Sequence, residues 1–136
     1  MKTTPTILVI DDDEDVCLVV ARMLEKRGYH VLQALSGEAA LALAGRYREQ
    51  IDLMLADVLL PRMSGCETYE RFRVTHPNAK VLFMTGYPGN VLNFAELAAR
   101  HIGCLPKPFT IDELAAKVRE VLALPYDPEH AHQAAA

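Results

Sequence analysis

The chain has 136 residues, of which 51% are apolar and 24% are charged, a balance typical of one soluble globular domain. Its formal net charge of −4 argues against a nucleic acid or an anionic membrane surface as the main partner. The three cysteines, Cys17, Cys66 and Cys104, have no CxxC spacing, so the sequence indicates a reducing compartment without a disulfide framework or a zinc site. No apolar run is long enough for a signal peptide or a membrane span, and we therefore expect a cytoplasmic protein.

Short apolar runs and longer amphipathic stretches alternate from the start of the chain. Along 15–26, apolar side chains recur at helical spacing, and Gly28 follows where a helix would end. Ser36 is a residue type that caps helices, and it follows a second apolar run. In chain order we predict a strand at 7–10, a helix over 15–26, a strand at 31–35 and a helix from Ser36 to near Gly45.

The same alternation continues through the rest of the chain. Ser64 and Glu67 have the spacing of a capping box, as do Thr110 and Glu113, and each pair precedes an amphipathic stretch. In chain order we predict a strand at 53–56, a helix from Ser64 that 76–78 interrupts, a strand at 81–84, a helix over 91–100, a strand at 102–105 and a helix from Thr110 to Leu122. Residues 125–136 are predicted to form a flexible C-terminal tail.

The alternation of strands and helices predicts the fold class. Strands that are apolar on both faces and joined by helices indicate a parallel sheet covered on both sides. We predict a flavodoxin-like α/β fold, with a doubly wound five-stranded parallel sheet of order 2-1-3-4-5 and five helices in three α/β/α layers. One domain is predicted over residues 1–124, with the tail outside it.

Polar side chains follow four of the predicted strands. Asp11 and Asp12 follow the first strand, Asp57 the third, Thr85 the fourth and Lys107 the fifth. Ligands of open parallel sheets bind outside the carboxyl ends of the strands, and the predicted order makes the first and third strands neighbours. Three converging carboxylates need positive charge among them, which Mg²⁺ and the lysine would supply. The set therefore predicts a carboxylate that accepts a phosphoryl group.

Each of these residues also has an ordinary structural explanation when it is taken alone. The acids of 11–15 suit a solvated helix N-terminus, where negative charge favours the helix dipole. An aspartate after a strand can cap a loop, a threonine in a strand is usually structural, and a lysine is usually a surface charge. Function is predicted only from the complete set.

Four segments resemble the receiver domain of two-component response regulators, and they occur in that family's order and intervals: ILVIDDDE, LMLADVLLPRMSG, VLFMTGY and LPKPF. The resemblance implies that Asp57 is the phosphoacceptor. It implies that Asp12 binds Mg²⁺ directly, together with Asp57 and the backbone carbonyl of Leu59, and that Mn²⁺ can substitute. Asp11 would hold the ion through water, and Gly65 matches the loop on the far side of the site.

The resemblance assigns three further residues and leaves one position in question. Thr85 would hydrogen-bond a phosphoryl oxygen and move on activation, Lys107 would pair with the phosphoryl group, and the Lys107–Pro108 peptide would be cis. Cys104 stands where the family usually has tyrosine or phenylalanine, so an aromatic side chain cannot carry the switch there. Tyr87 is a candidate to take part instead.

The same resemblance implies the partners and the role of the chain. The phosphoryl donor would be a histidine kinase or a histidine phosphotransfer protein, and the domain would catalyse only its own phosphorylation and dephosphorylation. A second copy or an output partner would bind the face formed by 91–100, 102–105 and the last helix. Direct nucleic-acid binding and membrane binding are not expected. The chain is either a stand-alone regulator or a receiver cut from a hybrid histidine kinase or a larger regulator.

Three other functions were weighed against this one. A phosphatase of the haloacid-dehalogenase type also uses an aspartate after a parallel strand, but it needs a second acid where this chain has Leu59. A flavin- or nucleotide-binding module would need backbone N–H groups after the first strand, where the acids 11–13 would repel phosphate. A degenerate receiver that works only by binding other proteins is the third alternative, and the complete set of site residues argues against it.

Overall fold

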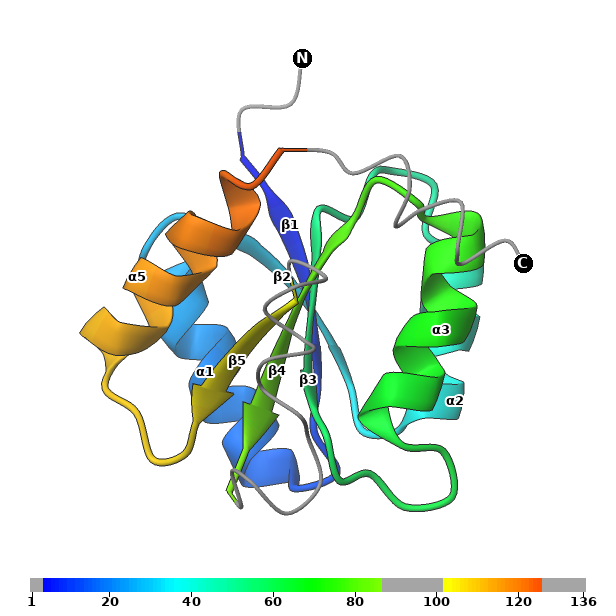
Figure 1. Cartoon of the computed structure of the whole chain (residues 1–136), viewed down its shortest axis with the longest axis horizontal. Helices are drawn as coiled ribbons and strands as arrows, with labels where there is room; N and C mark the ends of the chain where they lie inside the picture. Colours follow the sequence, from blue (N-terminus) through cyan, green and yellow to red (C-terminus); the bar gives the residue numbers. More distant parts are fainter. Residues whose placement is uncertain (1–3, 87–101, 126–136) are drawn as a thin grey trace.

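The computed structural model describes residues 4–86 and 102–125, and this part of the chain contains five strands and four helices (Figure 1). The strands are β1 (Thr6–Ile10), β2 (His30–Ala34), β3 (Leu53–Asp57), β4 (Lys80–Thr85) and β5 (Gly103–Pro106). The helices are α1 (Glu14–Glu25), α2 (Gly37–Arg46), α3 (Gly65–Thr75) and α5 (Ile111–Leu122).

The strands form one parallel sheet of order β2-β1-β3-β4-β5. Helices α1 and α5 cover one face of the sheet, and α2 and α3 cover the other (Figure 1). The predicted three-layer, doubly wound fold and its strand order are confirmed. Five helices were expected, and the predicted helix over 91–100 lies outside the described residues.

The register of the sheet brings the carboxyl ends of its strands to one edge. Ile10 pairs with Ala56, so Asp11 and Asp57 leave adjacent strands at the same level. Thr85 pairs with Pro106, which places Thr85 and Lys107 side by side at the next pair of strands. The topology thus gathers the predicted site residues at one edge of the sheet.

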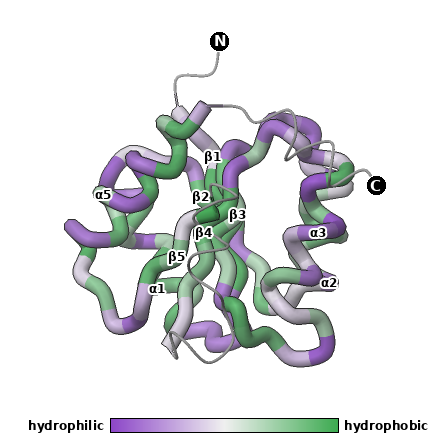
Figure 2. The backbone as a smooth tube through the Cα atoms, in the orientation of Figure 1, coloured by the Kyte–Doolittle hydropathy of each residue, from purple (hydrophilic) through white to green (hydrophobic). Residues whose placement is uncertain are grey.

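Two apolar clusters fill the space between the sheet and its two helical layers, and Figure 2 shows the hydrophobic strands at the centre. Strands β1, β3 and β4 are buried on both faces, as expected for strands in the middle of a parallel sheet. The edge strand β2 differs from the prediction. It covers His30–Ala34 in place of the predicted 31–35, only Ala34 of the five residues is buried, and Leu35 lies outside it and is 44% exposed. No described helix has the length and hydrophobicity of a membrane-spanning segment.

The helix ends follow local capping chemistry. Asp13 caps α1 through its carboxylate, and Gly28, just beyond the helix, has a φ of 92°, which glycine adopts without strain. The predicted capping box at Thr110 is complete. The one predicted at Ser64 is only half formed, because the Glu67 carboxylate pairs with Arg71, 3.2 Å away and one turn further along α3.

Candidate functional site

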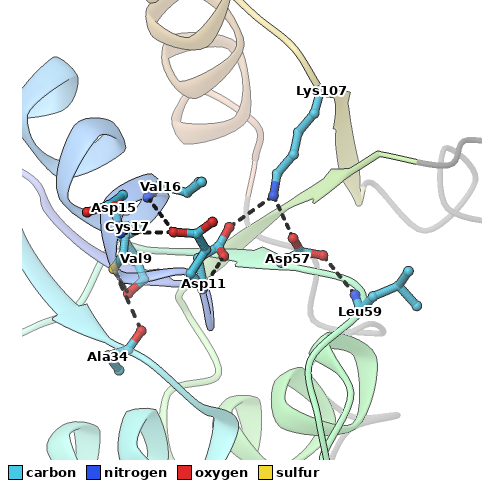
Figure 3. Close-up of polar contacts among 10 residues, drawn as sticks. Val9, Asp11, Asp15, Val16, Cys17, Ala34, Asp57, Leu59 and Lys107 are labelled. Carbon is cyan, nitrogen blue, oxygen red and sulfur yellow. Dashed lines mark hydrogen bonds and ion pairs between the residues drawn. The ribbon is translucent and has the colours of Figure 1, made fainter.

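Lys107 joins the ends of three strands. Its Nζ lies 2.6 Å from Oδ2 of Asp57 and 3.0 Å from Oδ2 of Asp11 (Figure 3). The Asp11 side chain is only 2% exposed, and the Asp57 side chain is 13% exposed. One ammonium therefore holds together two carboxylates that would otherwise repel each other in a partly buried site.

Two opposing effects act on the pKa of Lys107. Burial disfavours the ammonium and would lower the pKa. The hydrogen bonds and charges of Asp57 and Asp11 act in the other direction, and they hold the pKa of Lys107 above its ordinary value. The lysine is therefore a fixed positive charge at neutral pH.

Backbone hydrogen bonds fix the position of Asp57. The N–H of Leu59 donates to Oδ1 of Asp57 at 2.8 Å, so each carboxylate oxygen has a donor (Figure 3). The N–H of Val58 donates to the carbonyl of Met84 at 3.0 Å, and the N–H of Gly65 donates to the carbonyl of Val58 at the same distance. The segment that carries Asp57 is thus tied to both β4 and α3.

Thr85 ends β4 beside Lys107. Thr85 is buried, with 2% exposure, and its carbonyl accepts a hydrogen bond from the N–H of Lys107 at 2.8 Å. The Lys107–Pro108 peptide is cis, as the resemblance implied. The structure therefore places Thr85, Lys107 and Asp57 on three consecutive strands of the sheet, with Lys107 in contact with Asp57.

The remaining acid, Asp12, is exposed beside the buried Asp11. Within residues 4–86 and 102–125, no group of three or more His, Cys, Asp or Glu side chains is arranged as a metal cage. Magnesium does not require such a cage, because it keeps several waters and binds one or two carboxylates. Asp12, Asp57 and the carbonyl of Leu59 offer oxygen donors only, and this donor set fits Mg²⁺ better than a softer metal.

Cys104 and Tyr87 are the two positions on which the switch of the domain was left in question. Cys104 lies on β5 opposite Phe83 of β4, half-buried against the core cluster under α2 and α3. Burial raises the pKa of the Cys104 thiol to about 11, which leaves little reactive thiolate at neutral pH, so Cys104 is suited to packing and not to redox chemistry. Tyr87 lies outside the described residues.

Sequence analysis missed two features around the site. A cavity of about 370 Å³ lies beside Lys107, between α1 and the segment 107–109 that leads to α5. Val19 of α1 lines this cavity and is 51% exposed, although it is apolar. An apolar residue off the predicted buried face of the helix is the sequence signal. The second feature is a close contact between the backbones of Gly65 and Asp57. Its sequence signals are the match of Gly65 to the family's loop and the place of this glycine at the start of a helix, directly after a serine cap.

Comparisons with known proteins identify the family of the chain. Residues 7–119 match the family described as the response regulator receiver domain. The sensor kinase CckA of Brucella abortus is 35% identical over 122 residues, which are 90% of this chain and 13% of the kinase. The response regulator receiver protein CpdR of the same organism is 34% identical over 116 residues, 85% of this chain and 95% of CpdR.

A solved structure supports the fold independently. The chemotaxis protein CheY4 of Vibrio cholerae superposes with a TM-score of 0.76 at 26% identity, over 88% of this chain and 99% of that one. The chain also spans about half the length of the curated transcriptional regulatory proteins it matches. Receiver domains are signalling domains that interact with histidine kinases or phosphotransfer proteins, and they generally bind Mg²⁺ where they are phosphorylated. With its family match over most of the chain and a site of the expected residue types, this chain belongs to the response regulator receiver family of two-component systems.

Proposed function

We propose that Asp57 accepts a phosphoryl group from a histidine kinase or a histidine phosphotransfer protein and that the domain changes conformation as a result. The observation that carries this proposal is the partly exposed Asp57 carboxylate, held 2.6 Å from the Lys107 ammonium at the carboxyl edge of the sheet. A carboxylate beside a fixed cation is suited to meet a charged phosphoryl group, because the cation offsets the repulsion between them.

The proposed chemistry is an in-line transfer. A carboxylate oxygen of Asp57 attacks phosphorus, the P–N bond of the donor phosphohistidine breaks, and the imidazole leaves with the electron pair. Lys107 would exchange its contact with Asp57 for one with a phosphoryl oxygen, and Thr85 would donate its hydroxyl to another. Bound at Asp12, Asp57 and the Leu59 carbonyl, Mg²⁺ would supply further positive charge for the phosphoryl oxygens. Asp11 would keep Lys107 in place.

Transfer changes the charges that hold the site together. The acyl phosphate removes the carboxylate partner that Lys107 has in the unmodified protein, so the lysine and the end of β4 acquire a new preferred arrangement. A receiver that populates two conformations would then shift toward the one in which Thr85 and Lys107 contact the phosphoryl group. We further propose that the protein is cytoplasmic and that its receiver domain spans residues 1–124.

The relatives represent two arrangements of a receiver, alone or within a longer protein, and the proposal applies to both. CckA is a much longer sensor kinase, whereas CpdR is a receiver protein of almost the same length as the match. The same phosphoacceptor chemistry serves a stand-alone regulator and a receiver within a longer protein.

Intact-protein mass spectrometry after incubation with acetyl phosphate tests the proposal. We expect a single phosphoryl adduct that requires Mg²⁺ and is absent from Asp57→Asn. Asparagine keeps the shape of the side chain and lacks the nucleophilic carboxylate, so it separates chemistry from folding. An undiminished adduct on Asp57→Asn would place the phosphoacceptor elsewhere. A folded wild-type protein without an adduct, even with a phosphorylated histidine phosphotransfer protein as the donor, would contradict the proposal.

A further inference from the structure

The first turn of α3 lies directly against the backbone of Asp57, and Gly65 is the point of contact. A Cβ atom added to Gly65 would lie closer than 3.0 Å to the carbonyl oxygen of Asp57, and it would lie 3.1 Å from the carbonyl carbon of Asp57 and the Cα of Val58. All three obstacles are backbone atoms, so no side-chain rotation could relieve the overlap. The backbone of Gly65 does not have a positive φ, and the glycine is therefore required for space.

The first turn of α3 has little room to retreat from β3. On its other side, the buried Thr68 packs against Gly37 of α2, where an added Cβ would overlap the Thr68 hydroxyl. The Thr68 hydroxyl also donates to the carbonyl of Ser64 at 2.8 Å, and Ser64 accepts from the N–H of Glu67 at 3.0 Å. Two close glycine contacts thus hold the start of α3 between α2 and the end of β3.

The backbone of Asp57 in turn determines where its carboxylate lies. The segment after Asp57 is tied to β4 by the bond from Val58 to Met84 and to α3 by the bond from Gly65 to Val58. The carboxylate itself is held between Lys107 at 2.6 Å and the N–H of Leu59 at 2.8 Å. A displacement of the Asp57 carbonyl therefore changes the direction of the side chain relative to Lys107.

We propose that Gly65 is a positioning residue for Asp57, whose missing side chain lets the rigid first turn of α3 set the backbone, and hence the carboxylate, of the phosphoacceptor. This inference rests on the proposed function of Asp57. It assigns Gly65 no contact with the phosphoryl donor. It differs from a general requirement for tight packing, because Gly37 meets a comparable obstacle and lies against a side chain of α3 instead of the backbone of Asp57.

Three glycine-to-alanine variants test the proposal. Gly65→Ala introduces the overlap with Asp57, Gly37→Ala introduces a matched overlap with Thr68, and Gly45→Ala adds a methyl group where nothing lies within 4 Å. The rate of adduct formation with acetyl phosphate and Mg²⁺ is measured per folded molecule, in sucrose, which favours the folded state. We expect a loss of about tenfold or more for Gly65→Ala, since small misplacements of reacting groups have effects of that size. Gly45→Ala should react within about twofold of the wild-type rate, and Gly37→Ala should lose less than Gly65→Ala, because its overlap reaches Asp57 only through α3.

A second readout does not depend on phosphorylation. The amide resonances of Val58 and Leu59, whose N–H groups bond to Met84 and to the Asp57 carboxylate, should shift and lose protection from exchange in Gly65→Ala and stay unchanged in Gly45→Ala. If the wild-type protein forms no adduct, the proposed function fails, and this readout still decides whether Gly65 positions Asp57. A folded Gly65→Ala variant with wild-type amide resonances or a wild-type rate overturns the inference.

A milder variant covers the case in which Gly65→Ala does not fold. Ser64→Ala removes the N-cap bond of α3 and adds no atom, so the first turn is loosened without an overlap. We expect its rate to fall threefold or more on the folded protein. An unchanged rate together with unchanged amide resonances for Val58 and Leu59 would overturn the inference.

Discussion

The two ends of β3 each carry an aspartate, and the surroundings of the two carboxylates differ in kind. At the amino end, Asp52 accepts from the backbone N–H of Thr6 at 2.7 Å and from the amide of Gln50 at 2.6 Å. At the carboxyl end, Asp57 faces the ammonium of Lys107. The bond from Thr6 gives Asp52 a part in holding β1 and β3 together. The ammonium at Asp57 can exchange a carboxylate for a phosphoryl oxygen, and it does so at the edge where Asp11, Thr85 and Lys107 gather, so this end of the strand is suited to chemistry.

The largest expected effect is on phosphorylation, which substitution of Asp57 should abolish and substitution of Asp52 should not. Asp57→Asn should form no acyl phosphate, because the nucleophile is gone. Asp52→Asn, a matched change five positions earlier, should form the adduct within about twofold of the wild-type rate, since Asp52 lies at the opposite edge of the sheet. Mass spectrometry with acetyl phosphate measures both. Equal loss in the two variants would show that the assay reports folding and not the phosphoacceptor.

Lys107→Ala should lower the free energy of unfolding by roughly 2–3 kcal/mol without Mg²⁺, because Asp11 and Asp57 are left close together without their shared cation. Urea unfolding at neutral pH measures the change. Mg²⁺ should restore part of the loss if it binds beside Asp57, and the binding of Mg²⁺ itself should be largely intact.

A lysine of similar burial with a more exposed partner provides the control for that substitution. Lys117, 31% exposed, pairs with the 65% exposed Glu120 one turn along α5, and helical pairs with a solvated partner contribute about 0.5 kcal/mol. Lys117→Ala should therefore have almost wild-type stability. An equally small effect of Lys107→Ala would mean that the two carboxylates do not depend on the lysine in solution.

At the amino end of β3, substitution of the aspartate should affect stability more than phosphorylation. Asp52→Ala removes the acceptor for the N–H of Thr6 and should lower the free energy of unfolding by about 1–2 kcal/mol. Asp57→Asn should change it by less than about 1 kcal/mol, because the amide oxygen still accepts from Leu59 and Lys107 keeps Asp11 as its partner. Denaturant titration of both variants checks the difference. A greater loss of stability for Asp57→Asn would remove the distinction between a structural and a chemical aspartate.

Much of this arrangement follows from the sequence. Apolar runs and caps predict the strands, and their alternation with helices predicts a parallel sheet. The strand order was taken from flavodoxin-like folds, and with that order the positions just after the strands predict Asp11, Asp57, Thr85 and Lys107 as neighbours. The observed strand boundaries differ from the predicted ones by one residue where backbone pairing continues past the apolar run. Asp57, for example, is polar and is still the last residue of β3. The second strand was predicted at 31–35 and lies at His30–Ala34, because the apolar run extends one residue past the backbone pairing with β1.

The features that the sequence does not reveal depend on contacts between segments that are far apart in the chain. Asp52 resembles Asp57 as an acid next to a strand, and contacts such as those with Thr6 and Gln50, which the sequence does not show, indicate its structural role. Likewise, Gly65 matches a family motif, but its approach to the Asp57 carbonyl depends on how α3 packs against β3. Such contacts arise from tertiary packing, which periodicity does not encode.

The smallest expected effect is a dependence of stability on alkaline pH at the carboxyl end of β3. Because Asp57 and Asp11 raise the pKa of Lys107 in the folded protein, its contribution to stability is complete below the ordinary lysine pKa of 10.5 and is lost as pH rises through the folded value. Tyrosines, cysteines and other lysines titrate in the same range, so the difference between wild type and Lys107→Met is the informative quantity. That difference should shrink as pH rises. Lys117→Met serves as the control, and its difference from wild type should stay constant. A Lys107→Met difference that also stays constant would mean that the ammonium of Lys107, which holds Asp57 and Asp11 together, does not stabilise the fold.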